Sequence, residues 1–209
     1  MGKNKKIAIL GTATFTLAIG AWFSYQEFFT KGLDNLSSRV CDEGVERDTV
    51  RRVLPDTRSA EEGADTNGSG DSFMFSCRVY TANDSILSGE AKIQDSSQKT
   101  WEKYYKSYGG ESKGETEQSS SDGIYALSKE DFASVYVPCV PNGSRPDDAS
   151  QEYALVTEVR VIGESRITGI DLHQALTDFA YQITRRAYSL GDCQGVQEFP
   201  EKLPRFEKS

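Results

Sequence analysis

The sequence predicts an α+β protein in which an N-terminal transmembrane helix is followed by a disulfide-bonded ectodomain of antiparallel strands packed by helices. Three observations lead to this fold class. Residues 7–25 form an apolar run without a formal charge, and all four cysteines follow that run. Beyond it, segments with a two-residue apolar period alternate with segments of helical period, which is typical of mixed strands and helices.

Residues 7–25 are long enough to cross a bilayer as one helix. At about 1.5 Å per residue they reach about 28 Å, close to the roughly 30 Å hydrocarbon core. Three lysines precede the run and three aromatic residues lie near its end, which favours a single-pass protein with a cytoplasmic N-terminus and an extracytoplasmic C-terminal domain in the cell membrane. A cleavable signal peptide is the alternative, because it shares the basic start and apolar core, and Ala18-Ile19-Gly20 offers a small-x-small site.

The chain beyond the anchor is expected to form one domain with short flanks. The expected segments are the cytoplasmic flank and anchor 1–25, a juxtamembrane stalk 26–40, the extracytoplasmic domain 41–193 and an extended tail 194–209. Residues 109–122 are rich in glycine, serine and glutamate, as linkers are. They divide the domain into halves at about 41–108 and 123–193.

The ectodomain is acidic. The chain has 24 basic and 32 acidic residues, and the first 25 residues hold three of the lysines and no acid. Removing those three leaves 21 basic residues against 32 acidic ones, a net charge of −11. No basic cluster along the sequence compensates for this charge, so nucleic acid and anionic surfaces should repel the domain. We therefore expect no nucleic-acid partner.

The first half is predicted to contain a helix, a loop, a hairpin and a second helix. Residues 43–54 have valines at helical spacing, whereas residues 56–71 contain almost no apolar side chain and should form a mobile loop. Residues 72–79 and 87–93 alternate apolar and polar side chains, as the two strands of a hairpin do. A helix over residues 96–108 follows, with aromatic residues along one side.

The second half is predicted to contain three strands and a long helix. Residues 124–127 and 132–137 are apolar runs on either side of a short polar turn, and residues 142–151 should be an exposed loop. Residues 153–161 alternate as one long strand. The last helix covers residues 168–190, where Thr168 and Asp171 are spaced as in a capping box and leucines, Phe179 and Ile183 mark a buried stripe.

The cysteines are expected to form two disulfide bonds rather than a metal site. Their number is even, no CxxC or CxH spacing occurs, and an oxidising compartment is expected beyond the anchor. Three connectivities remain open from the sequence. We favour Cys41 with Cys77 and Cys139 with Cys193, because each half then joins a cysteine on or after its first hairpin to one beside a helix end.

No residue pattern indicates catalysis, a metal or a cofactor. His173 is the single histidine, and it lies inside the last predicted helix without a catalytic motif around it. Pairs of acidic residues occur in predicted loops and turns, at Glu61-Glu62, Glu130-Asp131 and Asp147-Asp148. Such pairs are typical of solvated surfaces and are weak indications of calcium binding or glycosidase chemistry.

The aromatic side of the helix over residues 96–108 is the segment with the clearest claim to function. Trp101, Tyr104, Tyr105 and Tyr108 recur at helical spacing, and such rings can bind sugars or partner side chains. They can also cover the neighbouring hairpin, residues 72–94. We expect Trp101 to belong to the core, and we take Tyr108 and Tyr105 as the candidate binding residues.

Several segments resemble uncharacterised single-pass, membrane-anchored envelope proteins of actinomycete bacteria. They are the basic start, the single apolar span, Cys41 before a valine-rich helix, Ser76-Cys77-Arg78-Val79, the run from Asp122 to Leu127, and the run from Tyr136 to Pro141. The resemblance covers most of the chain. It implies an envelope protein and assigns no catalytic residue.

These observations favour a non-enzymatic, membrane-tethered extracytoplasmic domain that binds an unknown envelope protein or polymer. The anchor, the expected disulfide bonds and the lack of a catalytic motif support this hypothesis. The alternative is a cell-wall hydrolase that uses carboxylates alone.

Overall fold

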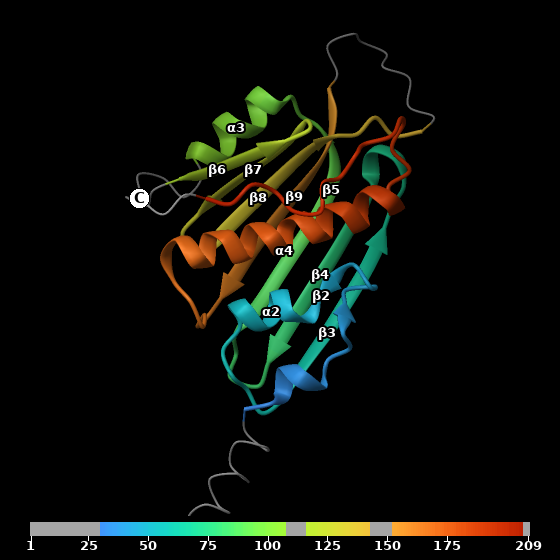
Figure 1. The fold of residues 1–209 in the computed structure, drawn as a ribbon. Helices are drawn as coiled ribbons and strands as arrows, with labels where there is room; N and C mark the ends of the chain where they lie inside the picture. Colours follow the sequence, from blue (N-terminus) through green and yellow to red (C-terminus); the bar gives the residue numbers. More distant parts are fainter. Residues whose placement is uncertain (1–29, 108–115, 143–151, 207–209) are drawn as a thin grey trace, which may run out of the picture.

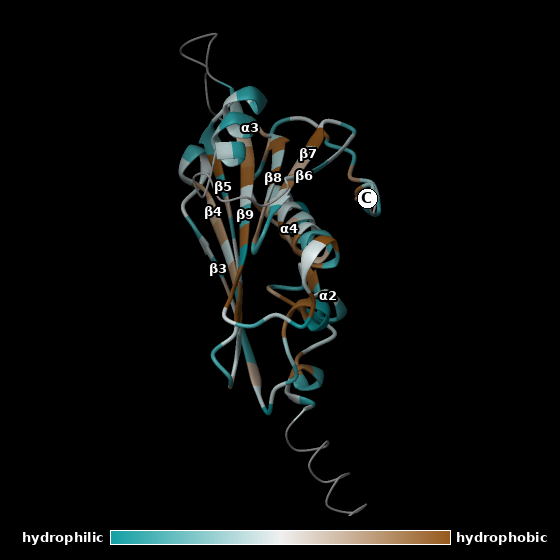
Figure 2. Ribbon diagram, turned by 90° about the vertical axis from the view of Figure 1, so that its left-hand side faces the viewer, coloured by the Kyte–Doolittle hydropathy of each residue, from teal (hydrophilic) through white to brown (hydrophobic). Residues whose placement is uncertain are grey.

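The computed structural model describes residues 30–107, 116–142 and 152–206. They form an α+β fold, in which one large antiparallel sheet carries helices on both faces (Figures 1 and 2). The helices are α2 at Arg47–Val53, α3 at Gln98–Ser107 and α4 at Gly169–Leu190. The expected anchor at residues 7–25 lies outside the described ranges, and within them no helix is long and apolar enough to span a bilayer.

Seven strands make up the main sheet in the order β3-β4-β5-β9-β8-β7-β6, and all neighbours are antiparallel. Their bounds are β3 Ala60–Asn67, β4 Met74–Thr81, β5 Ile86–Asp95, β6 Glu117–Ser121, β7 Ile124–Lys129, β8 Phe132–Pro138 and β9 Tyr153–Ile162. Because β9 lies between β5 and β8, the strands of both expected halves join in one sheet. A separate hairpin consists of β1 (Arg39–Val40) and β2 (Val45–Glu46).

The main core lies between the sheet and α4. Alternate side chains of β4 face this core, so that Phe75, Cys77 and Val79 are buried while Arg78 is exposed. Strands β4 and β5 pair directly, which confirms the predicted hairpin. The buried stripe predicted for the long helix is also confirmed, by the buried residues Leu172, Leu176, Phe179, Ile183 and Ala187 of α4.

The prediction of a mobile loop over residues 56–71 is wrong for residues 60–67, which form β3. All eight residues of β3 pair with β4, although nearly all of their side chains are exposed. An edge strand is held by backbone hydrogen bonds along one side and need not bury side chains, so its composition can resemble that of a loop. The same is true of β6, which occupies part of the expected linker 109–122; residues 108–115 lie outside the described ranges.

The first predicted helix begins later than expected. The sequence favours a helix from residue 43, but α2 begins at Arg47, because residues 41–44 form the turn between β1 and β2. Two short 3-10 turns complete the fold, η1 at Gly32–Asn35 and η2 at Gly70–Ser72. In the expected stalk, Leu33 and Leu36 are buried, so this part of the chain packs on the domain.

Replacing Gly89 by alanine is expected to lower the free energy of unfolding by about 1–3 kcal/mol. A Cβ at Gly89, in the middle of β5, would overlap Cδ1 of Ile183 and lie 3.3 Å from Cε1 of Phe179, both on α4. Both side chains are fully buried, so the added methyl group forces the end of the Ile183 side chain to shift within a packed core. Urea denaturation measures the effect, with Gly63→Ala on β3 as the control, since a Cβ there meets open space. Equal stabilities of the two variants would contradict close packing of α4 on β5.

Candidate functional site

Helix α3 packs its aromatic side on the face of the sheet opposite α4. Trp101 is 4% exposed, and its Nε1 donates a hydrogen bond to Ser134 Oγ on β8 at 2.9 Å. The core role predicted for Trp101 is therefore confirmed. The surface that it covers differs from the expected one, because α3 packs against β7, β8 and β9 rather than against the hairpin 72–94. An apolar helix side predicts that a surface is covered, and it does not specify which strands supply that surface.

Tyr105 also belongs to the interior. It is 3% exposed, its ring stacks on Phe132 with centroids 5.5 Å apart, and its hydroxyl donates a hydrogen bond to the Glu158 carboxylate. Burial, followed by this hydrogen bond to Glu158, raises the pKa of Tyr105 above its ordinary value. Of the two candidate binding residues, Tyr105 is thus an internal contact, and Tyr108 lies outside the described residues.

The acidic pairs singled out in the sequence lie apart from one another. Glu61 and Glu62 are exposed on β3, and Glu130 and Asp131 are exposed in the turn between β7 and β8. The pair at residues 147–148 is outside the described ranges. In those ranges, no group of three or more His, Cys, Asp or Glu side chains could hold a metal ion.

A groove opens where three segments far apart in the sequence meet. One wall is the β1–β2 hairpin with α2, the second is the outer side of α4, and the third is the C-terminal tail around Lys202. The groove has a volume of about 520 Å³. Most of its lining side chains are charged or polar, so it differs from the apolar pockets that usually hold small organic molecules. We refer to it below as the charged groove.

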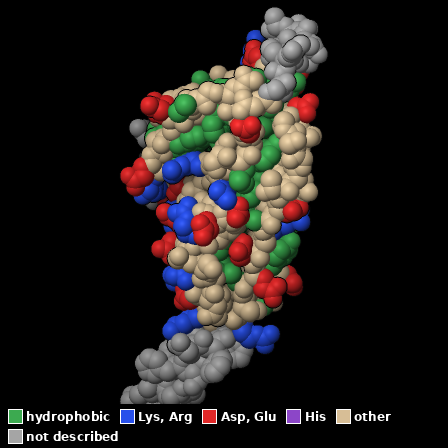
Figure 3. Space-filling view, turned by 90° about the vertical axis from the view of Figure 1, so that its right-hand side faces the viewer, with side chains coloured by type: hydrophobic (Ala, Val, Ile, Leu, Met, Phe, Trp, Pro, Cys, Tyr) green, Lys and Arg blue, Asp and Glu red, His purple; other side chains and the backbone are tan. Residues whose placement is uncertain are grey.

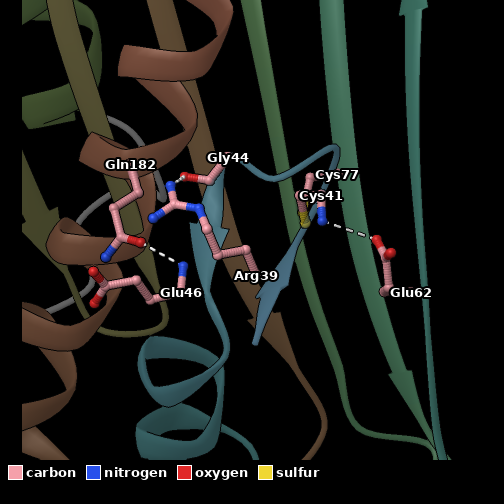
Figure 4. Close-up of a disulfide and its surroundings, with 7 residues drawn as sticks. All are labelled: Arg39, Cys41, Gly44, Glu46, Glu62, Cys77 and Gln182. Carbon is pink, nitrogen blue, oxygen red and sulfur yellow. Dashed lines mark hydrogen bonds between the residues drawn. A yellow bond between two sulfur atoms is a disulfide. The ribbon is translucent and has the colours of Figure 1, made fainter. Parts of the chain in front are cut away.

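The hairpin wall of the charged groove has an unusual backbone. Three consecutive residues other than glycine, Cys41, Asp42 and Glu43, have positive φ angles of 57°, 54° and 59°. The left-handed conformation costs about 1–2 kcal/mol for each such residue. Arg39 opposes this cost, because its Nε donates a hydrogen bond to Glu43 O at 2.6 Å. Its Nη2 donates another to Gly44 O at 3.3 Å (Figure 4).

A disulfide bond and a carboxylate hold the same turn from the side of the sheet. Cys41 is bonded to Cys77 on β4, with their Cα atoms 5.3 Å apart, and the Cys41 N–H donates a hydrogen bond to Glu62 Oε2 at 2.9 Å (Figure 4). Local strain of this kind persists only where surrounding contacts determine it, and it is concentrated at functional sites. The turn therefore presents the exposed side chains of Asp42 and Glu43 in a fixed position.

The second disulfide bond joins Cys139, just after β8, to Cys193, just after α4. Their Cα atoms are 5.0 Å apart, and Pro141 forms an isolated antiparallel bridge with Cys193. Both pairs match the connectivity favoured from the sequence. The bond at Cys193 fixes the point from which the tail leaves α4.

Helix α4 connects directly to the hairpin and to α2. Gln182 Oε1 accepts a hydrogen bond from the Glu46 N–H at 2.7 Å, and Gln182 Nε2 donates one to Thr49 Oγ1 at 2.8 Å. An ion pair between Arg52 and Asp178 adds a contact at 2.9 Å. These contacts fix the distance between the first two walls of the charged groove.

The tail forms the third wall because it is anchored to α4 at several points. Phe206 N–H donates a hydrogen bond to Gln174 Oε1 at 3.0 Å, and Tyr181 OH donates one to Pro200 O at 2.5 Å. Leu203 is buried, and the ring of Phe199 lies 5.2 Å from that of Tyr188 between centroids. The intervening charged residues of the tail are thereby held at the groove.

Besides its ion-paired residues, the groove carries charges of both signs that no other described residue neutralises. The exposed basic residues Arg185, Lys202 and Arg205 form no ion pair with another described residue. The same is true of the exposed acidic residues Glu43, Glu46 and Glu201. On the face seen from the side of β3, basic and acidic side chains are likewise interspersed (Figure 3). A ligand that carries both signs of charge would complement this surface.

The charged groove is not apparent from the sequence. Its basic residues come from the hairpin, α2, α4 and the tail, and so no basic cluster is visible along the chain. The adjacent pairs Arg185-Arg186 on the last helix and Arg51-Arg52 on the first are the local signals in the sequence. No family model, curated protein or solved structure matches the chain, so the site stands on its own geometry.

Proposed function

We propose that the protein is a non-enzymatic extracytoplasmic interaction module, tethered to the membrane by residues 7–25. The charged groove is the observation that carries this proposal. It is rigid on the hairpin side and is assembled from three remote segments. Several of its charged side chains are exposed and form no ion pair with another described residue. The two disulfide bonds support an oxidising compartment, in which such cross-links persist.

The ligand that suits the groove best is a polypeptide segment of another envelope protein. A polymer of one charge sign would meet like charges, because Arg185, Lys202 and Arg205 share the groove with Glu43, Glu46 and Glu201. A protein segment can place carboxylates against the arginines and amines against the glutamates. The planar guanidinium groups of Arg185 and Arg205 suit carboxylates in particular, since each can bind one with two parallel hydrogen bonds.

A cell-wall hydrolase that uses carboxylates alone has less support. Such an enzyme needs two carboxyl groups on either side of the scissile bond, one of them available as a proton donor. The half-buried carboxylate of the groove, Asp178, is engaged by Arg52 at 2.9 Å and by the Gln174 amide at 3.0 Å. The remaining groove carboxylates are exposed, which suits a binding surface better than acid catalysis.

Photocrosslinking in intact cells tests the proposal. A photoreactive amino acid at Lys202, in the groove, should capture one protein of defined mass, and the same amino acid at Lys103, exposed on α3, should not. Arg185→Glu combined with Arg205→Glu should reduce the capture by about tenfold, the effect of losing about 1.4 kcal/mol of binding free energy. Lys99→Glu combined with Lys103→Glu, exposed on α3, is the matched control and should leave it unchanged.

Two results would contradict the proposal. Equal capture at Lys202 and Lys103, or capture insensitive to the arginine substitutions, would remove the charged groove as the binding site.

The membrane tether is tested by a separate experiment. Protease added to spheroplasts should remove the domain. Survival of the domain until the membrane is permeabilised would place it on the cytoplasmic side.

A further inference from the structure

We propose that the outer edge of β3 accepts a basic, extended segment of a partner protein as an additional strand of the sheet. This inference concerns a surface separate from the charged groove and does not rest on it. The two edges of the sheet differ. At the β6 edge the tail is close, since Ser119 Oγ donates a hydrogen bond to Pro204 O at 2.9 Å. At the β3 edge, no strand of the described residues other than β4 pairs with β3 (Figure 1).

The register shows which backbone groups of β3 point outward. Ala82 N–H donates a hydrogen bond to Ser59 O at 3.0 Å, and this pair continues the β3–β4 ladder by one step. In an antiparallel ladder, hydrogen-bonded pairs alternate with non-bonded pairs. The odd-numbered residues of β3 therefore bond to β4, and the N–H and C=O groups of Ala60, Glu62, Ala64 and Thr66 point away from the sheet.

This edge lacks the usual obstacles to strand addition. Natural edge strands are commonly short, bulged, interrupted by proline or covered. Strand β3 is eight residues long, has a continuous register with β4, contains no proline, and is exposed. Its one protective feature is charge, from Glu61, Glu62 and Asp65.

The acidic side chains select against a second copy of this chain. Two β3 edges paired with each other would bring six carboxylates into two adjacent strands. In the antiparallel register centred on Gly63, Glu61 of each copy would lie directly opposite Asp65 of the other copy. Like charges at such positions are destabilising. A strand that places basic side chains opposite Glu61 and Asp65 would gain from the same geometry.

The spacing of the acids defines the partner segment. Glu61 and Asp65 lie four residues apart on the face of the sheet opposite α4, whereas Glu62 lies on the α4 face, where it accepts the Cys41 hydrogen bond. The complementary segment is therefore an extended chain with two Lys or Arg residues four positions apart. Backbone hydrogen bonds provide the affinity of such strand addition, and the side chains provide the specificity.

A labelled peptide tests this inference on the full-length protein in detergent micelles. The probe is the capped heptapeptide Thr-Lys-Val-Thr-Val-Lys-Thr, with glutamates in place of the lysines as the control peptide. The lysine peptide should bind by fluorescence anisotropy, and the glutamate peptide should bind at least about tenfold more weakly, a difference typical of close opposite-charge contacts. In the complex, hydrogen exchange should slow at the outward amides of Glu62, Ala64 and Thr66.

Two variants separate backbone pairing from charge. Ala64→Pro removes one outward N–H and leaves the β4 ladder intact, and Glu61→Gln with Asp65→Asn removes the charge. Each should weaken binding by about tenfold or more, as loss of one anchoring contact does. Glu130→Gln with Asp131→Asn, in the distant β7–β8 turn, should have no effect.

Three outcomes would overturn the inference. One is peptide binding that Ala64→Pro does not change in a folded variant, and another is the lack of slowed exchange at the three outward amides of the parent protein. If Ala64→Pro fails to fold, the exchange measurement on the parent protein alone decides the test. The third is a dimer, detected by sedimentation, that Ala64→Pro dissociates, because it would assign this edge to a second copy of the chain. None of these outcomes bears on photocrosslinking at Lys202.

Discussion

Replacing Trp101 by alanine is expected to lower the free energy of unfolding by about 3–5 kcal/mol, the usual cost of deleting a large buried ring. The side chain is 4% exposed, its ring centroid lies 5.6 Å from that of Tyr136, and its indole N–H is bonded to Ser134 Oγ. The substitution therefore leaves a cavity between α3 and the sheet and removes one hydrogen bond from the Ser134 hydroxyl. Urea denaturation followed by circular dichroism measures the loss.

Two further variants make this result specific. Trp101→Phe keeps an aromatic ring but loses the bond to Ser134, so its stability should lie between those of the parent and Trp101→Ala. Lys103→Ala changes an exposed residue of the same helix and should stay within about 0.5 kcal/mol of the parent. A Trp101→Ala protein that unfolds at the same urea concentration as the parent would show that the ring is not part of the core.

Removing the Cys41–Cys77 bond by Cys41→Ser with Cys77→Ser is expected to cost about 4 kcal/mol. The bond joins residues 36 positions apart, and the chain-entropy model gives about 4 kcal/mol for closing a loop of this size. The same variant removes the covalent link between the left-handed turn and β4, so that only the non-covalent contacts of the turn with Arg39, Glu62 and Arg186 hold it. Amide exchange in residues 41–44 should accelerate more than exchange in β4.

The second pair provides the comparison. Cys139→Ser with Cys193→Ser opens a loop of 54 positions and should cost a similar amount, about 4 kcal/mol, while leaving exchange at the hairpin turn unchanged. Mass mapping under non-reducing conditions verifies the two bonds in the parent. Four free thiols in protein taken from the cell envelope would contradict both bonds and the expected location.

Elements whose side chains are buried on one side could be predicted from the sequence. The alternation at Phe75, Cys77 and Val79 and the helical stripe through Leu176 and Phe179 record burial directly, and so β4, β5 and α4 lie where expected. Strand β3 could not be found this way. Its exposed sequence, AEEGADTN, has no apolar alternation, because backbone pairing with β4 holds it.

The site could be predicted less well than the fold. Of the three connectivities that the sequence leaves open, the order of helices and strands around each cysteine favours the one found, in which the partners lie within one half of the chain. The left-handed turn at Cys41 has no glycine to indicate it, since Asp42 and Glu43 are held there by contacts with Arg186 and Arg39. The charged groove depends on tertiary packing of the tail, which periodicity does not report.

The position of β9 has a consequence for how the protein folds. Strand β9 follows the other six strands of the main sheet in the chain, yet it lies between β5 and β8. Until it is in place, β3-β4-β5 and β6-β7-β8 are two three-stranded pieces without a shared hydrogen bond, and α4 is also missing from their common core. Such dependence on late, non-local pairing slows folding and makes it cooperative. A domain that is exported across a membrane starting from its N-terminal end, behind an anchor, would therefore stay unfolded until nearly all of it had emerged.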